Sequence, residues 1–147
     1  MKSSEPSTHR AEACVSELIA APPESVWSLI GDFGRLDWLP GTEITADGEG
    51  VGAMRYSRQP DGSIVAEQLE ACDVAGMSYS YSIADGALPF TDYQATLKVV
   101  ATADGGALIE WAATFIPAPG WPEGKLEHLI RKMYGKGLRE AKRRLET

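Results

Sequence analysis

The sequence is poor in cysteine and contains no long apolar run. Cys14 and Cys72 are the only cysteines among 147 residues. Two cysteines are too few for a disulfide scaffold, so we expect two reduced, buried thiols. No run of 18 apolar residues occurs, and no basic segment followed by an apolar one opens the chain. These absences predict a chain that neither spans a membrane nor is secreted, and therefore a cytoplasmic protein.

Motifs for metal binding and nucleophilic catalysis are also missing. His9 and His128 lie far apart, and no CxxC or HxxxH spacing accompanies them, so we predict no metal site and no cofactor. No GxSxG motif indicates a serine nucleophile. The glycine-rich segment 48–52 resembles a phosphate-binding loop, but a strand pattern follows it instead of a helix, so we expect a hairpin loop.

Basic residues are scarce in the first 120 residues, which carry 6 Lys and Arg against 17 Asp and Glu. The last 27 residues carry 8 basic and 4 acidic side chains, within an overall net charge of −7. The acidic total argues against nucleic acid or an anionic membrane as a partner. We interpret the basic C-terminal segment as the solvated face of a helix, although a basic stripe could also contact phosphates.

What the chain does contain is a regular alternation of apolar and polar residues. Segment 77–83 (MSYSYSI) alternates strictly, which is typical of a half-buried strand. Pro22-Pro23 predicts the start of a helix, because proline is tolerated in a first helical turn. The expected elements are a flexible tail over 1–10, strands over 11–20, 42–47, 53–58, 63–73, 77–83, 91–101 and 107–116, short helices after Pro22 and over 36–39, and a long helix from about Pro122.

The order of these elements predicts an α+β fold, with a curved seven-stranded antiparallel sheet around one long C-terminal helix. Strands joined by short turns pair antiparallel, because a parallel pair needs a long crossover. One face of the sheet must be covered, and the only large apolar surface left is the helix from Pro122. A twisted sheet that curls around this helix encloses a pocket. We therefore expect one domain over 11–147 that binds a small, largely hydrophobic molecule.

Within strand 63–73 the expected inward positions are Val65, Glu67, Leu69 and Ala71, of which only Glu67 is charged. An unpaired buried charge is costly, so we expect a partner. A three-residue turn over 60–62 would place Arg55 opposite Glu67, with Cβ atoms about 5 Å apart. A guanidinium can bind an oxyanion and a carboxylate can move a proton, so this pair is the candidate catalytic site. The alternative interpretation is an ion pair that only fixes the strand register.

The remaining walls of the pocket are expected to be apolar and aromatic. Tyrosine hydroxyl groups among the inward positions can donate hydrogen bonds to a ligand. Gly137 falls on the apolar stripe of the long helix, where a missing side chain lets backbone approach the sheet or leaves room for a ligand. The candidate ligand-binding residues are Tyr79, Tyr81, Phe90, Tyr93, Leu97, Trp111, Met133 and Gly137.

Over residues 11–146 the sequence resembles the START/Bet v 1-like superfamily, often called the polyketide cyclase/dehydrase and lipid-transport group. The resemblance rests on PPESVWSLIGDFGRLDWLP, the glycine-rich turn into VGAMRY, the strand IVAEQLEACD, the stretch MSYSYSIADGALPFTDYQATLKVV and the terminal amphipathic helix. It implies the helix-grip fold and a ligand cavity. That expectation agrees with the architecture argued from the strand pattern.

Within this group the pattern is similar to plant lachrymatory-factor synthases and their bacterial relatives, in which an Arg and a Glu handle a small sulfenic acid by proton transfer. The matching positions are Arg55 in MRY and Glu67 in AEQLE. The chain lacks the Ser-Gly-Leu-Pro-Ala gate of related plant hormone receptors, and Leu88-Pro89-Phe90 matches such loops only in part. The resemblance implies cofactor-free cyclase, dehydratase or isomerase chemistry. A non-catalytic carrier or sensor is the alternative, and a subunit acting through its surface is a third if side chains fill the cavity.

Overall fold

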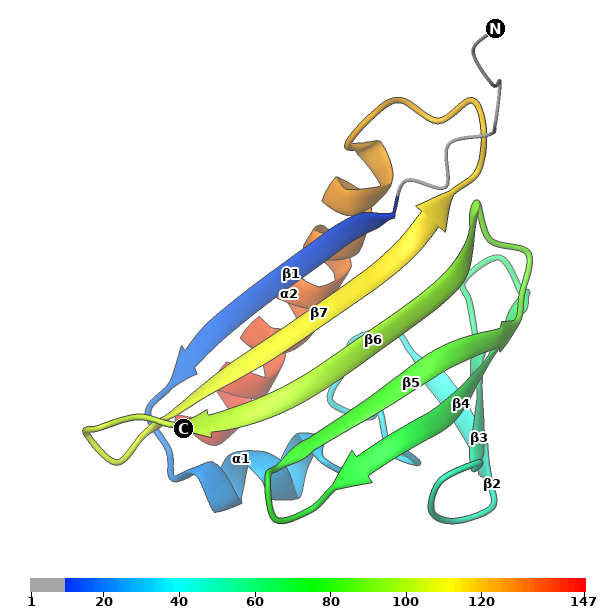
Figure 1. Ribbon diagram of the computed structural model, residues 1–147. Coiled ribbons are helices and arrows are strands. Elements are labelled where there is room, and N and C mark those ends of the chain that lie inside the picture. Colours follow the sequence, from blue (N-terminus) through cyan, green and yellow to red (C-terminus); the bar gives the residue numbers. More distant parts are fainter. Residues whose placement is uncertain (1–9) are drawn as a thin grey trace, which may run out of the picture.

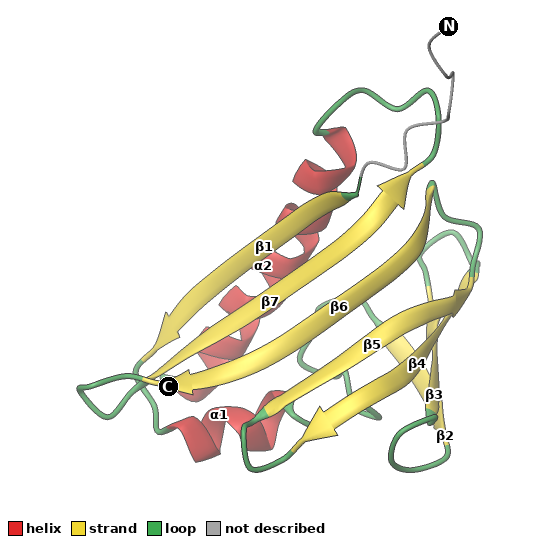
Figure 2. Cartoon of the chain, viewed as in Figure 1, coloured by secondary structure: helices red, strands yellow, loops and turns green. Residues whose placement is uncertain are grey.

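The computed structural model describes residues 10–147, whose strands form one antiparallel sheet (Figures 1 and 2). The strand order is β1-β7-β6-β5-β4-β3-β2. The expected tail over 1–10 lies outside the described residues except for Arg10, which forms an ion pair with Asp92. The elements are β1 (Ala11–Ile19), α1 (Pro23–Ile30), β2 (Glu43–Asp47), β3 (Met54–Arg58), β4 (Ile64–Asp73), β5 (Ser78–Asp85), β6 (Phe90–Ala101), β7 (Ala107–Pro117) and α2 (Lys125–Leu145).

The alternation in the sequence determines which face of each strand is buried. In β5, Tyr79 and Tyr81 are buried, whereas the serines between and beside them are only half-buried. The alternation continues in the next two strands, because every second residue over 93–99 in β6 and over 109–115 in β7 is buried: Tyr93, Ala95, Leu97, Val99, Ile109, Trp111, Ala113 and Phe115. Large aromatic and branched side chains therefore form one continuous inner face of the sheet.

Helix α2 lies against the face toward which β4, β3 and β2 curl, and it runs behind β1 and β7 in the view of Figure 1. Leu126, Ile130 and Leu138 are among the residues that it buries. Leu129 and Met133 belong to the same apolar stripe but are 39% and 48% exposed, because they lie at the mouth of a cavity between α2 and the sheet. No helix among residues 10–147 is long and apolar enough to cross a membrane.

Two local predictions were wrong. Segment 36–39, expected to be a second short helix, is a single turn in which the Leu39 N–H donates to the Leu36 carbonyl at 2.9 Å. Pro40 follows at once and has no N–H to continue a helix. Cys14 and Cys72 are free thiols, as expected, but both are exposed. Cys14 occupies an outward position of β1, on the solvated face of the sheet. Cys72 lies opposite Tyr79 near the end of β4, beyond a register shift between Leu69 and Ala71.

The turn between β3 and β4 sets the register that the sequence predicted. The Gln59 N–H donates to the Ser63 carbonyl at 2.8 Å, and the Gly62 N–H donates to the Gln59 carbonyl at 2.9 Å. Gly62 has a φ of 89°, in the left-handed region that glycine adopts without strain. Counting back from this turn pairs Arg55 with Glu67, so the predicted register is confirmed.

We expect Gly62→Ala to lower the free energy of unfolding by about 1–2 kcal/mol, because an alanine Cβ is strained at positive φ. Gly62→Asn should lower it less, since asparagine tolerates this conformation better. Urea denaturation of the three proteins measures the difference. Equal stability of the alanine variant and the wild type would show that the turn does not need a left-handed residue.

Candidate functional site

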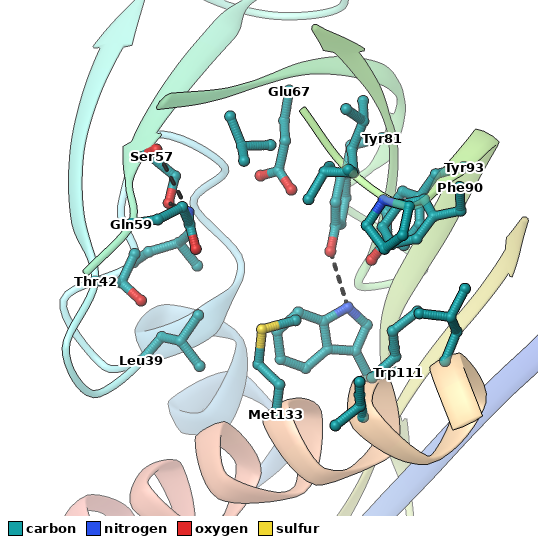
Figure 3. Close-up of a pocket in the computed structure, with 18 of the residues that line it drawn as sticks. Leu39, Thr42, Ser57, Gln59, Glu67, Tyr81, Phe90, Tyr93, Trp111 and Met133 are labelled. Atoms are coloured by element: carbon teal, nitrogen blue, oxygen red, sulfur yellow. Dashed lines mark hydrogen bonds between the residues drawn. The ribbon is translucent and has the colours of Figure 1, made fainter. Parts of the chain in front are cut away.

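A cavity of about 250 Å³ lies between α2 and the curled sheet (Figure 3). Its polar lining is a small set of side chains from the sheet, from the loop before β2 and from the turn after β3: Thr42, Arg55, Ser57, Gln59, Glu67, Tyr81 and Tyr93. The rest of the lining is apolar, and it comes from strands, loops and α2: Leu36, Leu39, Val65, Ile83, Leu88, Pro89, Phe90, Trp111, Trp121, Leu126, Leu129, Ile130 and Met133. Such a mixture is typical of a site for a small organic molecule.

The predicted pair of Arg55 and Glu67 forms an ion pair at the wall of this cavity. The Arg55 Nε donates to Glu67 Oε1 at 2.6 Å, and the two side chains are 1% and 14% exposed. The Arg55 Nη1 donates to the Phe33 carbonyl at 3.0 Å and to the Tyr79 hydroxyl at 3.4 Å. The guanidinium is thus held by β4, β5 and the loop after α1 together.

Aromatic faces complete the surroundings of Arg55. Its Cζ lies 4.2 Å from the centre of the Phe33 ring and 4.6 Å from that of Tyr81, within the range of a cation–π interaction. Burial on its own would lower the pKa of Arg55, but the oxygens of Tyr79 and Glu67 outweigh it and raise the pKa above its usual value. Arg55 therefore keeps its positive charge inside an apolar environment.

Part of the pair remains available to a ligand. Among residues 10–147, no group accepts a hydrogen bond from the Nη2 of Arg55, and no group donates one to the Oε2 of Glu67. Both residues line the cavity, and Figure 3 shows the Glu67 carboxylate pointing into it. The arrangement offers one cationic donor and one carboxylate oxygen to a bound molecule.

Tyr81 and Trp111 supply a second polar point on the wall. The Trp111 Nε1 donates to the Tyr81 hydroxyl at 3.1 Å (dashed in Figure 3), so the Tyr81 hydrogen can be donated to a ligand. Burial raises the pKa of Tyr79, Tyr81 and Tyr93 above the usual value for a phenol. All three side chains are therefore neutral hydroxyl groups at pH 7.

The sequence reasoning missed a group of polar residues at one side of the cavity. Figure 3 shows Thr42, Ser57 and Gln59 together, away from Tyr93. The Gln59 Nε2 donates to the Ser57 Oγ at 3.0 Å. Ser57 and Gln59 follow Arg55 at alternate positions, so the same strand period could have identified them. Thr42 lies in a loop, where no periodic signal exists.

The structure brings most of the predicted ligand-binding residues to one cavity. Besides the ion pair, the lining includes Tyr81, Phe90, Tyr93, Trp111 and Met133. The other three candidates lie outside it. The Tyr79 hydroxyl accepts a hydrogen bond from the Arg55 Nη1, but Tyr79 does not line the cavity. Leu97 is fully buried in the core. A Cβ on Gly137 would clash with the Leu39 side chain, so this glycine permits close packing of α2 and leaves no space for a ligand.

Residues that could bind a metal ion do not cluster among residues 10–147. Within the described part of the chain, no three His, Cys, Asp or Glu side chains lie close enough together to hold a metal ion. The chemistry that this site can supply from its own residues is hydrogen bonding, charge stabilisation and proton transfer.

We expect Tyr79, Tyr81 and Tyr93 to stay protonated in the folded protein at pH values where an unfolded tyrosine ionises. An unfolded phenol has a pKa of about 10, so the free energy of unfolding should fall as the pH rises above about 10. Ultraviolet absorbance of phenolate and far-UV circular dichroism can be followed in one titration. Ionisation of all the tyrosines near pH 10 with an intact dichroism spectrum would contradict the burial of these hydroxyl groups.

Comparisons with known proteins agree with this fold. The protein XoxI from Bacillus cereus superposes with a TM-score of 0.83 at 31% identity, covering 92% of this chain and 95% of that one. An uncharacterised protein from Bacillus thuringiensis gives the same TM-score and identity, with 93% and 100% covered. MLP-like protein 423 from Arabidopsis thaliana is 32% identical over 111 residues, which span 66% of this chain and 70% of that protein.

A family model described as polyketide cyclase/dehydrase and lipid transport matches residues 10–146. The match covers nearly the whole described chain, including the sheet, α2 and all the residues of the cavity. This chain therefore belongs to the polyketide cyclase/dehydrase and lipid transport family, within the START/Bet v 1-like superfamily.

Proposed function

We propose that this protein binds a small, largely hydrophobic molecule that carries an oxygen, and that it catalyses cofactor-free proton transfer on that molecule. The observation that carries the proposal is the ion pair of Arg55 and Glu67 in the wall of an otherwise apolar cavity. Removing a guanidinium from water is costly, and the cost rises with each donor left without a partner. A pair that only fixed strand register would not need a donor facing an open cavity.

Each group has a role that follows from its position. The Arg55 Nη2 and the Tyr81 hydroxyl bind the oxygen of the substrate, on which negative charge develops. The Glu67 Oε2 takes a proton from the neighbouring carbon. Return of this proton to another carbon completes an isomerisation, and its transfer to a departing hydroxyl group releases water in a dehydration. The apolar walls exclude bulk water and strengthen the electrostatic interactions of the pair.

A specific observation also favours the rival function, a non-catalytic carrier or sensor. The Arg55 Nε already donates to Glu67 Oε1 at 2.6 Å, so the two side chains compensate each other's charge without a reacting molecule. In that version the pair only orients the polar end of the ligand. Binding is common to both versions, and turnover separates them.

We expect the neutral fluorophore prodan, which has an apolar ring system and one ketone oxygen, to bind the folded protein with one-to-one stoichiometry. Val65→Phe should weaken binding by at least about tenfold, because Val65 lines the cavity and the larger ring occupies its space. Fluorescence titration measures the affinity.

Ile64→Phe is the matched control for this substitution. Ile64 is the neighbouring residue of β4 and is 44% exposed, so the same ring is added on the outer face of the sheet. Thermal unfolding confirms that both variants are folded. Equal affinity of the two variants for prodan would mean that the probe binds outside the cavity.

For the catalytic version we expect the protein to accelerate the ring opening of nitrobenzisoxazole, a general probe of carboxylate bases. A base removes the proton on carbon, the N–O bond breaks, and a coloured phenolate is released. Glu67→Gln should lower kcat/KM about a hundredfold or more, because it removes the base.

Glu70→Gln should leave this rate unchanged, since Glu70 is an exposed carboxylate on the same strand. Prodan binding to Glu67→Gln shows that its cavity is intact. A rate that is the same in wild type and Glu67→Gln would exclude Glu67 as the proton-transfer group and leave the carrier as the function.

A further inference from the structure

A second hollow adjoins the mouth of the cavity. Its volume is about 390 Å³, and it lies between the loop before β2, the end of β3 with the turn that follows, and helix α2. It shares Leu129 and Met133 of α2 with the cavity, and it also shares Thr42 and Gln59 on the opposite side. A molecule longer than the cavity would therefore continue from it into this hollow.

The charged residues that line the hollow are all basic: Arg58, Lys132 and Lys136. This composition contrasts with the rest of the molecule, because the first 120 residues carry 17 acidic and only 6 basic side chains. Lys132 and Lys136 lie one helical turn apart on the same face of α2. Like charges at this spacing destabilise a helix slightly unless a counter-ion is present.

Counter-ions are supplied elsewhere on the same helix but not here. Glu140 forms ion pairs with both Arg143 and Arg144 in the last turns of α2. Among residues 10–147, by contrast, no carboxylate oxygen lies within 4.0 Å of a side-chain nitrogen of Lys132, Lys136 or Arg58. Glu43 is the residue opposite Arg58 in the sheet, and it too forms no ion pair with it.

We infer that the ligand is amphipathic, with an apolar body in the cavity and an anionic head group, such as a phosphate, in this basic hollow. The inference rests on the proposed binding function and names the class of molecule that the site takes. The oxygen near Arg55 lies at the inner end of such a ligand, and the anion lies at the outer end. The net charge of −7 opposes binding to an anionic membrane surface, so the ligand is a free small molecule.

Isothermal titration calorimetry with octyl phosphate and octanol tests the inference, because the two probes differ only in the head group. Octyl phosphate should bind the wild type more tightly than octanol. Lys132→Gln combined with Lys136→Gln should weaken octyl phosphate binding about tenfold and leave octanol binding unchanged. Raising the salt concentration should weaken only the binding of octyl phosphate.

Arg131→Gln combined with Arg139→Gln is the matched control. It removes the same charge from exposed positions of α2 that do not line the hollow, and it should leave the binding of both probes unchanged. An equal loss of octyl phosphate binding in this control would reduce the effect to net charge and overturn the inference.

The remaining outcomes separate the inference from the proposed function. If both probes bind all three proteins equally well, the cavity binds ligands but the basic hollow does not select an anion. If neither probe binds the wild type, the proposed binding function fails as well. Cosedimentation with phosphatidylglycerol vesicles that depends on Lys132 and Lys136, without preference for octyl phosphate, would assign the hollow to a membrane surface and overturn the inference.

Discussion

The burial of the Arg55 guanidinium is the constraint on which the rest of the site depends. A cation removed from water must be compensated by charge, hydrogen bonds and polarisable faces. Here Glu67 supplies the charge, the Phe33 carbonyl and Tyr79 accept hydrogen bonds, and the rings of Phe33 and Tyr81 lie over the cation. These groups come from β4, β5 and the loop after α1, so the arrangement exists only when these segments pack together in the folded chain.

The curvature of the sheet creates the cavity, and the polar groups placed around it would orient a bound ligand. Because the sheet bends around α2, the inner faces of β3 to β7 diverge from the helix and leave space that side chains do not fill. The ion pair and Tyr81 mark one polar region of this space, and Lys132 and Lys136 mark another beyond its mouth. Leu129 and Met133 of α2 line both spaces on one side, and Thr42 and Gln59 line both on the other. A ligand with polar groups at both ends would therefore bind in one orientation.

Much of the sheet and of the cavity lining could be predicted from the sequence, because strands have a period of two and short turns fix the strand register. Tyr81, Tyr93 and Trp111 were found by alternation, and the turn before Ser63 placed Arg55 opposite Glu67. Loop residues such as Trp121 and Thr42 carry no period, so their place in the lining could not be predicted. Gly137, Tyr79 and Leu97 share a face with cavity residues, but their neighbours in the folded chain separate them from the cavity.

A crystal structure of the complex with prodan tests the central claim most directly, namely that the Arg55 donor is available to a ligand oxygen inside the cavity. The account predicts the naphthalene ring between β4, β7 and α2, with the ketone oxygen about 3 Å from the Arg55 Nη2. A cavity filled by inward movement of Met133 and Trp121, with prodan bound elsewhere or absent, would contradict it.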